Sequence, residues 1–221
     1  MDEHLREVFW SMLSPRRARR MLEVLENRTR YVTVLLEAVD DGHNQAAVLR
    51  SAEAFGVQDV SVVEGEKPFS PSPGITQGSD RWLTIHRHRS IEEAASFLRE
   101  RGYRLWGSRL DGNAVPLQEV DLSRPAAFLF GNEHEGLSGR ALELVDGTFV
   151  VPMRGFVQSL NISVAAAITL FHATNRARAE AKEDYPLDEA ARREVLMRWI
   201  STTNPRARRV LRVLEGRGGG R

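Results

Sequence analysis

The chain has 221 residues, no cysteine and a formal net charge of +1. Without cysteine, a disulfide scaffold, a cysteine-ligated zinc site, an iron–sulfur cluster and a cysteine nucleophile are excluded. The apolar runs are shorter than the roughly 20 residues that a membrane span needs, and charges from Asp2 onward are unlike a secretory signal. We therefore expect a cytoplasmic protein with no membrane contact.

The charges are divided unevenly along the chain. Residues 1–30 have a net charge of +2, residues 31–175 one of −6 and residues 176–221 one of +5. Of the 31 basic residues, 29 are arginine, whose planar guanidinium pairs well with phosphate. Basic ends on an acidic body indicate that the ends bind a polyanion, although codon bias and solvated helix faces would give the same totals.

The two ends resemble each other. Residues 15–26 read PRRARRMLEVLE and residues 205–215 read PRARRVLRVLE. Each segment starts with proline and spaces its apolar residues as an amphipathic helix does. We therefore divide the chain into a basic helical N-terminal extension (1–30), a central domain (31–182) and a basic helical C-terminal extension (183–221).

Strands and helices alternate through the central domain. Apolar, β-branched runs predict strands at residues 31–39, 57–63, 83–86, 103–109, 126–130 and 149–153. Helical spacing predicts helices at residues 44–55, 91–101, 138–145 and 163–181, with Gly56, Gly102 and Ser138 as caps. Residues 64–80 are rich in Pro, Gly and Ser and predict a long loop. This alternation predicts an α/β fold, a parallel sheet covered on both faces.

Ligands of such sheets bind beyond the carboxyl ends of the strands, and polar residues gather in the loops there. Residues 130–138 read FGNEHEGLS, with glycines that allow close approach of a ligand; a capped turn with solvated acids is the alternative. Residues 151–163 read VPMRGFVQSLNIS, with Ser159, Asn161 and Ser163 near the expected helix start. N-capping accounts for one of these three polar residues but not for all of them. Asn44 and Arg50 form a third candidate, unless Asn44 only caps a helix and Arg50 is solvated.

Several common sites are absent from the sequence. Ser159 with His134 and an aspartate would make a hydrolytic triad, but the G-x-S-x-G turn that presents such a serine is missing. The chain also lacks a P-loop and a G-x-G-x-x-G after its first strand. The six histidines have no metal-ligand spacing, so we expect no metal.

Three segments together resemble the ordered motifs of a known family. They are Asn44 and Arg50 with Phe55-Gly56, then residues 130–138, then residues 151–165. In this order and spacing they are similar to the SpoU/TrmH family of RNA 2′-O-ribose methyltransferases, in the SPOUT superfamily. The resemblance covers about residues 30–178, and residues 111–115 (DGNAV) and 121–125 (DLSRP) make it strongest to members that methylate guanosine 18 of tRNA.

The resemblance implies a fold, a cofactor and a set of site residues. The fold would be a parallel-sheet SPOUT fold with a deep C-terminal trefoil knot, an exception to unknotted topology. The cofactor would be S-adenosylmethionine, and the protein a homodimer with the knot region in the interface. The positions that would contact the cofactor are Ser108, Gly131, Val151 and Leu160. The family's functional positions fall on Asn44, Arg50, Glu133, Ser159 and Asn161.

The chemistry needs a positioned ribose hydroxyl that loses its proton as it attacks. Arg50 is the candidate that the resemblance offers, but a guanidinium stays protonated at neutral pH and is therefore a poor base. We therefore hypothesise that Arg50 acts together with an RNA phosphate, while Glu133 and Asn44 hold Arg50 or the ribose. Ser159 and Asn161 would shape the loop and the cofactor pocket.

The partner predicted for the basic residues is tRNA. The arginines expected to contact its phosphates are Arg16, Arg17, Arg19, Arg20, Arg176, Arg178, Arg206, Arg208 and Arg209. Two alternatives remain open at this point: the same chemistry at another ribose of tRNA or ribosomal RNA, and a non-catalytic RNA-binding module on the same fold.

Overall fold

The computed structural model describes residues 10–110, 112–204, 207 and 209. Thr29–Pro186 form one compact unit, which we call the sheet unit. The described residues of Met1–Arg28 and Leu187–Arg221 form a second, which we call the helical unit. The described parts of the two predicted extensions thus lie largely in one unit.

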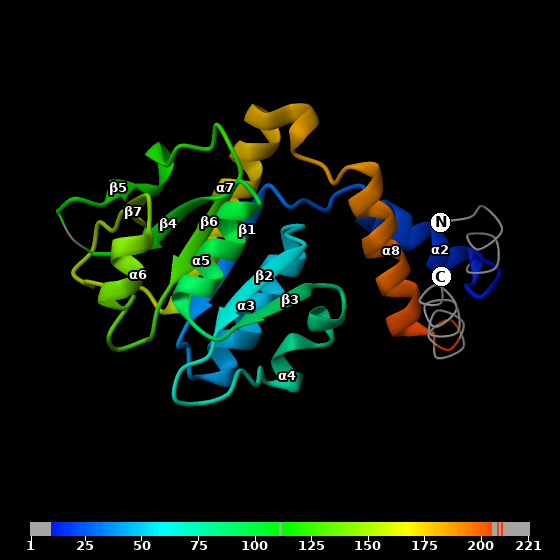
Figure 1. The fold of residues 1–221 in the computed structure, drawn as a ribbon, viewed down its shortest axis with the longest axis horizontal. Helices are drawn as coiled ribbons and strands as arrows, with labels where there is room; N and C mark the ends of the chain where they lie inside the picture. Colours follow the sequence, from blue (N-terminus) through cyan, green and yellow to red (C-terminus); the bar gives the residue numbers. More distant parts are fainter. Residues whose placement is uncertain (1–9, 111, 205–206, 208, 210–221) are drawn as a thin grey trace, which may run out of the picture. The chain divides into compact units, whose positions relative to one another are not determined.

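The sheet unit is built on seven parallel strands (Figure 1). Their order is β3-β2-β1-β6-β4-β7-β5. The strands are β1 (Val32–Glu37), β2 (Asp59–Val63), β3 (Thr84–His88), β4 (Arg104–Ser108), β5 (Val115–Pro116), β6 (Ala126–Phe130) and β7 (Gly147–Val150). The predicted α/β fold with a parallel sheet is therefore confirmed. The sequence missed β5, a two-residue edge strand that contains a proline and is too short to show a period.

Helices cover both faces of the sheet. α3 (Gly42–Ala54) and α7 (Ile162–Ala181) lie on one face, and α5 (Ile91–Glu100) and α6 (Gly139–Leu144) lie on the other. The short helix α4 (Pro73–Thr76) packs against α3. Leu36 of β1 belongs to the core under α3 and α7, whereas its neighbour Leu35 belongs to the core under α5 and α6. Alternate residues of a strand point to opposite faces, so this central strand, buried throughout, fills both cores.

The three predicted caps are present, whereas the alternative that Asn44 caps a helix and the prediction of a continuous loop at residues 64–80 are wrong. Ser138 caps α6 with its side-chain oxygen, and Gly56 and Gly102 follow α3 and α5 with φ of +80° and +82°. Asp41, and not Asn44, caps α3, because its side chain accepts the bond from the His43 N–H. Within the predicted loop 64–80, α4 and a 3-10 turn at Ser79–Arg81 form.

The helical unit contains α2 (Pro15–Leu25), as predicted, and α8 (Glu189–Thr203). Ser14 caps α2 and Asp188 caps α8 through their side-chain oxygens. Buried Met21 and Leu25 of α2 and buried Trp199 and Ile200 of α8 supply its apolar interior. The helix predicted at residues 205–215 lies largely outside the described residues. No helix of the described chain is long and apolar enough to cross a membrane.

Candidate active site

A cleft of about 630 Å³ lies at the carboxyl ends of β4 and β6. Its volume is in the usual range for a cofactor or substrate. The loop after β6, the residues after β4 and the start of α7 line it. Of the predicted site residues, the lining includes Ser108, Gly131, Glu133, Ser159, Leu160 and Asn161.

The loop after β6 folds back on itself. Asn132 and Gly136 exchange two backbone hydrogen bonds of 2.9 Å, and Gly136 has a φ of +71°. A Cβ atom on Gly131 would lie 2.1 Å from the carbonyl carbon of Gly136. Gly131 is therefore required by the loop's own fold, and not simply by the approach of a ligand as the sequence suggested.

The Asn132 side chain ties this loop to the end of β1. Its Oδ1 accepts a 2.9 Å bond from the His134 N–H, and its Nδ2 donates a 2.9 Å bond to the Ala38 carbonyl. Ala38 has a φ of +51°, which is uncommon for a residue with a side chain. The bond to Asn132 satisfies the carbonyl of this strained residue.

Glu37 anchors the same loop from the last position of β1. The side chain is buried, yet its two oxygens accept bonds from the Ser138 hydroxyl (2.7 Å) and the Ser138 N–H (2.9 Å). A buried carboxylate needs such donors to offset its desolvation. Sequence reasoning missed Glu37, although an acid that ends an otherwise apolar strand was a usable signal.

A chain of hydrogen bonds joins the three motif segments. The Asn161 Nδ2 donates to the Asn44 Oδ1 (3.1 Å), and the Asn44 Nδ2 donates to the Glu133 Oε1 (2.9 Å). Asn161 also caps α7, because its Oδ1 accepts a 2.8 Å bond from the Ser163 N–H. The cap orients the Asn161 amide, Asn161 orients that of Asn44, and Asn44 orients the Glu133 carboxylate.

The lining of the cleft suits S-adenosylmethionine. Leu110, Leu137 and Leu160 offer apolar surface for its adenine, while Glu133 and Glu135 offer carboxylates for its sulfonium and ammonium groups. Arg109 also lines the cleft and matches the cofactor's own carboxylate. The side chains present therefore fit the predicted cofactor in charge and in polarity.

Three of the predicted site residues, Asn44, Arg50 and Val151, are not among the residues that line this cleft. Val151 follows β7 and packs partly buried against the core of the α3 and α7 face. Arg50 is exposed, and its Nη1 lies 3.5 Å from the Ile75 carbonyl oxygen. Six helical positions separate Arg50 from Asn44, so the two project about 120° apart around α3. Asn44 bonds to Glu133 and Asn161 instead, so the expectation that it holds Arg50 is not met within one chain.

The hydrolytic alternative gains no support from the geometry. Ser159 and His134 both line the cleft, and both are exposed. Within the described residues no hydrogen bond joins them. A nucleophilic serine needs a base within hydrogen-bond reach, so this arrangement is no triad. The described residues also hold no group of three or more side chains able to bind a metal.

The arginines predicted to bind RNA differ in their surroundings. Arg16, Arg17, Arg19 and Arg20 of α2 are exposed, as is Arg209. Arg176 instead donates to the carbonyls of Gln118 and Val120 and pairs with Glu180. Arg178 lies over the Tyr185 ring, 5.4 Å from its centroid. Arg206 and Arg208 lie outside the described residues.

Comparisons with known proteins agree with the fold and with the motif resemblance. The model of the SpoU rRNA Methylase family matches residues 31–171. A tRNA (guanosine(18)-2'-O)-methyltransferase of Thermus thermophilus is 41% identical over 188 residues, covering 83% of this chain and 95% of the relative. The crystal structure of the A. aeolicus TrmH/SpoU tRNA modifying enzyme superposes with a TM-score of 0.76 at 34% identity, covering 84% of this chain and 95% of that one.

A third relative was crystallised with a ligand. The SpoU methyltransferase AviRb from Streptomyces viridochromogenes, in complex with the cofactor AdoMet, superposes with a TM-score of 0.56 at 25% identity. The match covers 70% of this chain and 61% of that chain.

Proposed function

The chain belongs to the SpoU rRNA methylase family, and on that premise we propose that it methylates the 2′-oxygen of a tRNA ribose with S-adenosylmethionine, at guanosine 18. The observation that carries this proposal is the hydrogen-bond chain from Asn161 through Asn44 to Glu133, which joins all three motif segments at one cleft. The relatives that cover most of the chain support the target nucleotide, because they carry the name of that activity.

Bound S-adenosylmethionine supplies an electrophilic methyl group, so the protein has to position the ribose and assist loss of its proton. Glu133 presents a carboxylate whose Oε1 is held by Asn44, which leaves acceptor capacity for a ribose hydroxyl. Ser108, Gly131 and Leu160 line the cleft where the cofactor would bind, and Val151 would contact the cofactor from the end of β7. Ser159, exposed at the loop before α7, adds a hydroxyl group.

Arg50 enters the proposal through a second copy of the chain. Val164, Ile168 and Phe171 recur at helical spacing on α7 and are 45%, 39% and 57% exposed, which supports the predicted homodimer through the knot region. An Arg50 that projects away from Asn44 within its own chain is available to the partner's cleft. There its guanidinium would bind an RNA phosphate and orient the 2′-hydroxyl.

Mixed dimers test this assignment. A dimer of one Arg50→Ala chain and one Asn161→Ala chain keeps one intact site if Arg50 acts across the interface, and none if it acts within its own chain. We expect mixed dimers of the two impaired variants to recover part of the methyl transfer that each variant alone has lost. No recovery of activity, with mixed dimers detected by native mass spectrometry, would indicate that Arg50 acts in its own subunit.

The proposed trefoil knot is supported by the connection from β4 to β6. This connection runs out to β5 at the sheet edge and returns through Leu117–Glu119, which contacts α7. Arg176 of α7 donates hydrogen bonds to the Gln118 and Val120 carbonyls, which hold the connection against the helix. Because α7 also contacts β1, the helix touches both the sheet and the connection, which is what a threaded chain would produce.

The charges of the two units support the proposed partner. The helical unit has 15 arginines and nine acidic residues, a net charge of +6, whereas the sheet unit has 16 basic and 21 acidic residues, a net charge of −5. The exposed arginines of α2, together with Arg209, would contact tRNA phosphates.

Transfer of a tritiated methyl group from S-adenosylmethionine to a tRNA transcript, followed by mapping of the methylated ribose, tests the proposal. We expect label at guanosine 18 and none in a transcript with a 2′-deoxy sugar there. Label at another ribose would support the proposed methyl transfer but show that guanosine 18 is not the target. Cofactor binding by calorimetry without any transfer would favour the non-catalytic RNA-binding module.

A further inference from the structure

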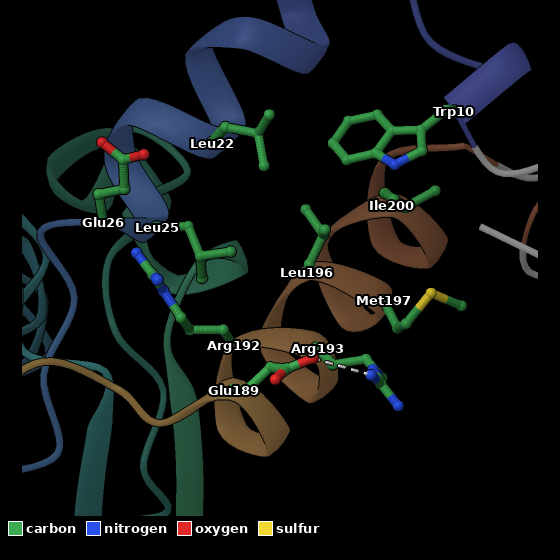
Figure 2. Close-up of a pocket in the computed structure, with 10 residues that line it drawn as sticks. All are labelled: Trp10, Leu22, Leu25, Glu26, Glu189, Arg192, Arg193, Leu196, Met197 and Ile200. Carbon is green, nitrogen blue, oxygen red and sulfur yellow. Dashed lines mark hydrogen bonds and ion pairs between the residues drawn. The ribbon is translucent and has the colours of Figure 1, made fainter. Parts of the chain in front are cut away.

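A second cleft lies within the helical unit. It has a volume of about 230 Å³, and α2, α8 and Trp10 line it (Figure 2). The apolar lining consists of Trp10, Leu22, Leu25, Leu196, Met197 and Ile200. Figure 2 shows the side chains of Trp10, Leu22 and Leu196 directed toward a common space. A volume below the usual range for whole cofactors suits a small planar group.

The rim of this cleft carries polar groups of both signs. Arg193 pairs with Glu189 at 3.2 Å at one end. Glu26, which directly follows α2, and Arg192 of α8 lie on the rim as well (Figure 2). A guanidinium and a carboxylate together can bind the donor and acceptor edge of a nucleobase.

We propose that this cleft binds one unstacked nucleobase of the tRNA, with the Trp10 indole as the stacking surface. Three observations on the same unit carry this: a net charge of +6 that attracts a polyanion, an aromatic wall, and a polar rim. Unpaired bases of RNA are held by stacking on aromatic side chains. The inference rests on the proposed function in that its ligand is the same tRNA, but it concerns binding and not methyl transfer.

Salt dependence separates this base contact from phosphate contacts. We expect Trp10→Ala to raise the Kd for full-length tRNA about ten-fold with an unchanged slope of log Kd against log salt, because no phosphate contact is lost. Trp10→Phe, which keeps a stacking ring, should restore most of the affinity. Arg16→Ala, the matched control on α2, should instead reduce the slope.

A second variant guards against loss of folding. Leu22 is 42% exposed, so Leu22→Trp fills the cleft without emptying the core, and it should weaken tRNA binding as Trp10→Ala does. Unchanged tRNA affinity in both variants would overturn the proposal. A changed oligomeric state of either variant in analytical ultracentrifugation would also overturn it, because the cleft would then be a contact between protein chains. The affinity for S-adenosylmethionine, measured by calorimetry, should be unchanged in both variants. The proposed function is tested independently, by methyl transfer with the unsubstituted protein.

Discussion

The two units of the chain hold their polar side chains in different ways. In the sheet unit, Asn161, Asn44 and Glu133 come from separate elements and hydrogen-bond in series beside the cleft. In the helical unit, Arg16, Arg17 and Arg19 are exposed on one helix. Methyl transfer requires groups fixed within fractions of an ångström, whereas a phosphate backbone is held by charge with little demand on geometry. Substitutions in the sheet unit should therefore affect turnover and cofactor binding, whereas substitutions in the helical unit should affect tRNA binding.

The largest effect is expected at Gly131. In Gly131→Ala the new methyl group would meet the Gly136 backbone at 2.1 Å, so the loop has to move, at a cost of about 3 kcal/mol, and cofactor binding should be lost. Gly139→Ala is the matched control, because nothing lies within 4 Å of its added methyl. Calorimetry and thermal unfolding measure both, and tight cofactor binding by Gly131→Ala would contradict the role assigned to this loop.

Arg50→Lys should rank next. Lysine keeps the charge but lacks the planar fork that binds phosphate through two bonds, so turnover should fall about 100-fold, as when one charge-stabilising donor is lost. Cofactor affinity should not change, because Arg50 is outside the cleft lining. Exposed Arg89 provides the control substitution Arg89→Lys. Full turnover by Arg50→Lys would rule out a specific guanidinium role.

A smaller effect on turnover is expected at Asn161, whose side chain bonds both to Asn44 and to the Ser163 N–H at the start of α7. Asn161→Ser keeps a cap for α7 but cannot reach Asn44, so turnover should fall roughly ten-fold while the free energy of unfolding stays within about 0.5 kcal/mol. Asn161→Ala loses the cap as well and should cost about 1 kcal/mol more. Single-turnover kinetics and urea unfolding measure the two effects. If Asn161→Ser kept full turnover, the hydrogen-bond chain would not position Glu133.

The smallest effects on the chemistry should come from the helical unit. Arg16→Ala with Arg17→Ala should raise the Michaelis constant for tRNA several-fold and lower the salt slope by about 2, one for each lost phosphate contact. The turnover number and the Michaelis constant for the cofactor should stay unchanged. Equal changes in the Michaelis constants for tRNA and for the cofactor would contradict the proposal that the helical unit binds tRNA and the sheet unit carries out methyl transfer.

Local sequence was enough to predict elements that depend on neighbouring residues. The apolar run at residues 126–130 is β6, and Ser138 caps α6. The site depends instead on distant pairs: Asn161 and Asn44 are 117 positions apart, and Ser138 and Glu37 are 101. No periodicity reports which residues meet over such separations, so Glu37 passed unnoticed. The motif resemblance found Asn44, Glu133 and Asn161 but not the order of their bonds.

The amino-acid sequence by itself determined the parallel α/β sheet, the family and the division between an acidic body and basic ends. These features follow from composition, periodicity and ordered motifs, which are properties of the chain before it folds. Only the tertiary structure decided that Arg50 lies apart from Asn44, that Arg176 fastens a connection to α7, and that both ends share one unit with its own cleft. Each of these depends on which surfaces pack together, because packing sets the direction and the partners of every side chain.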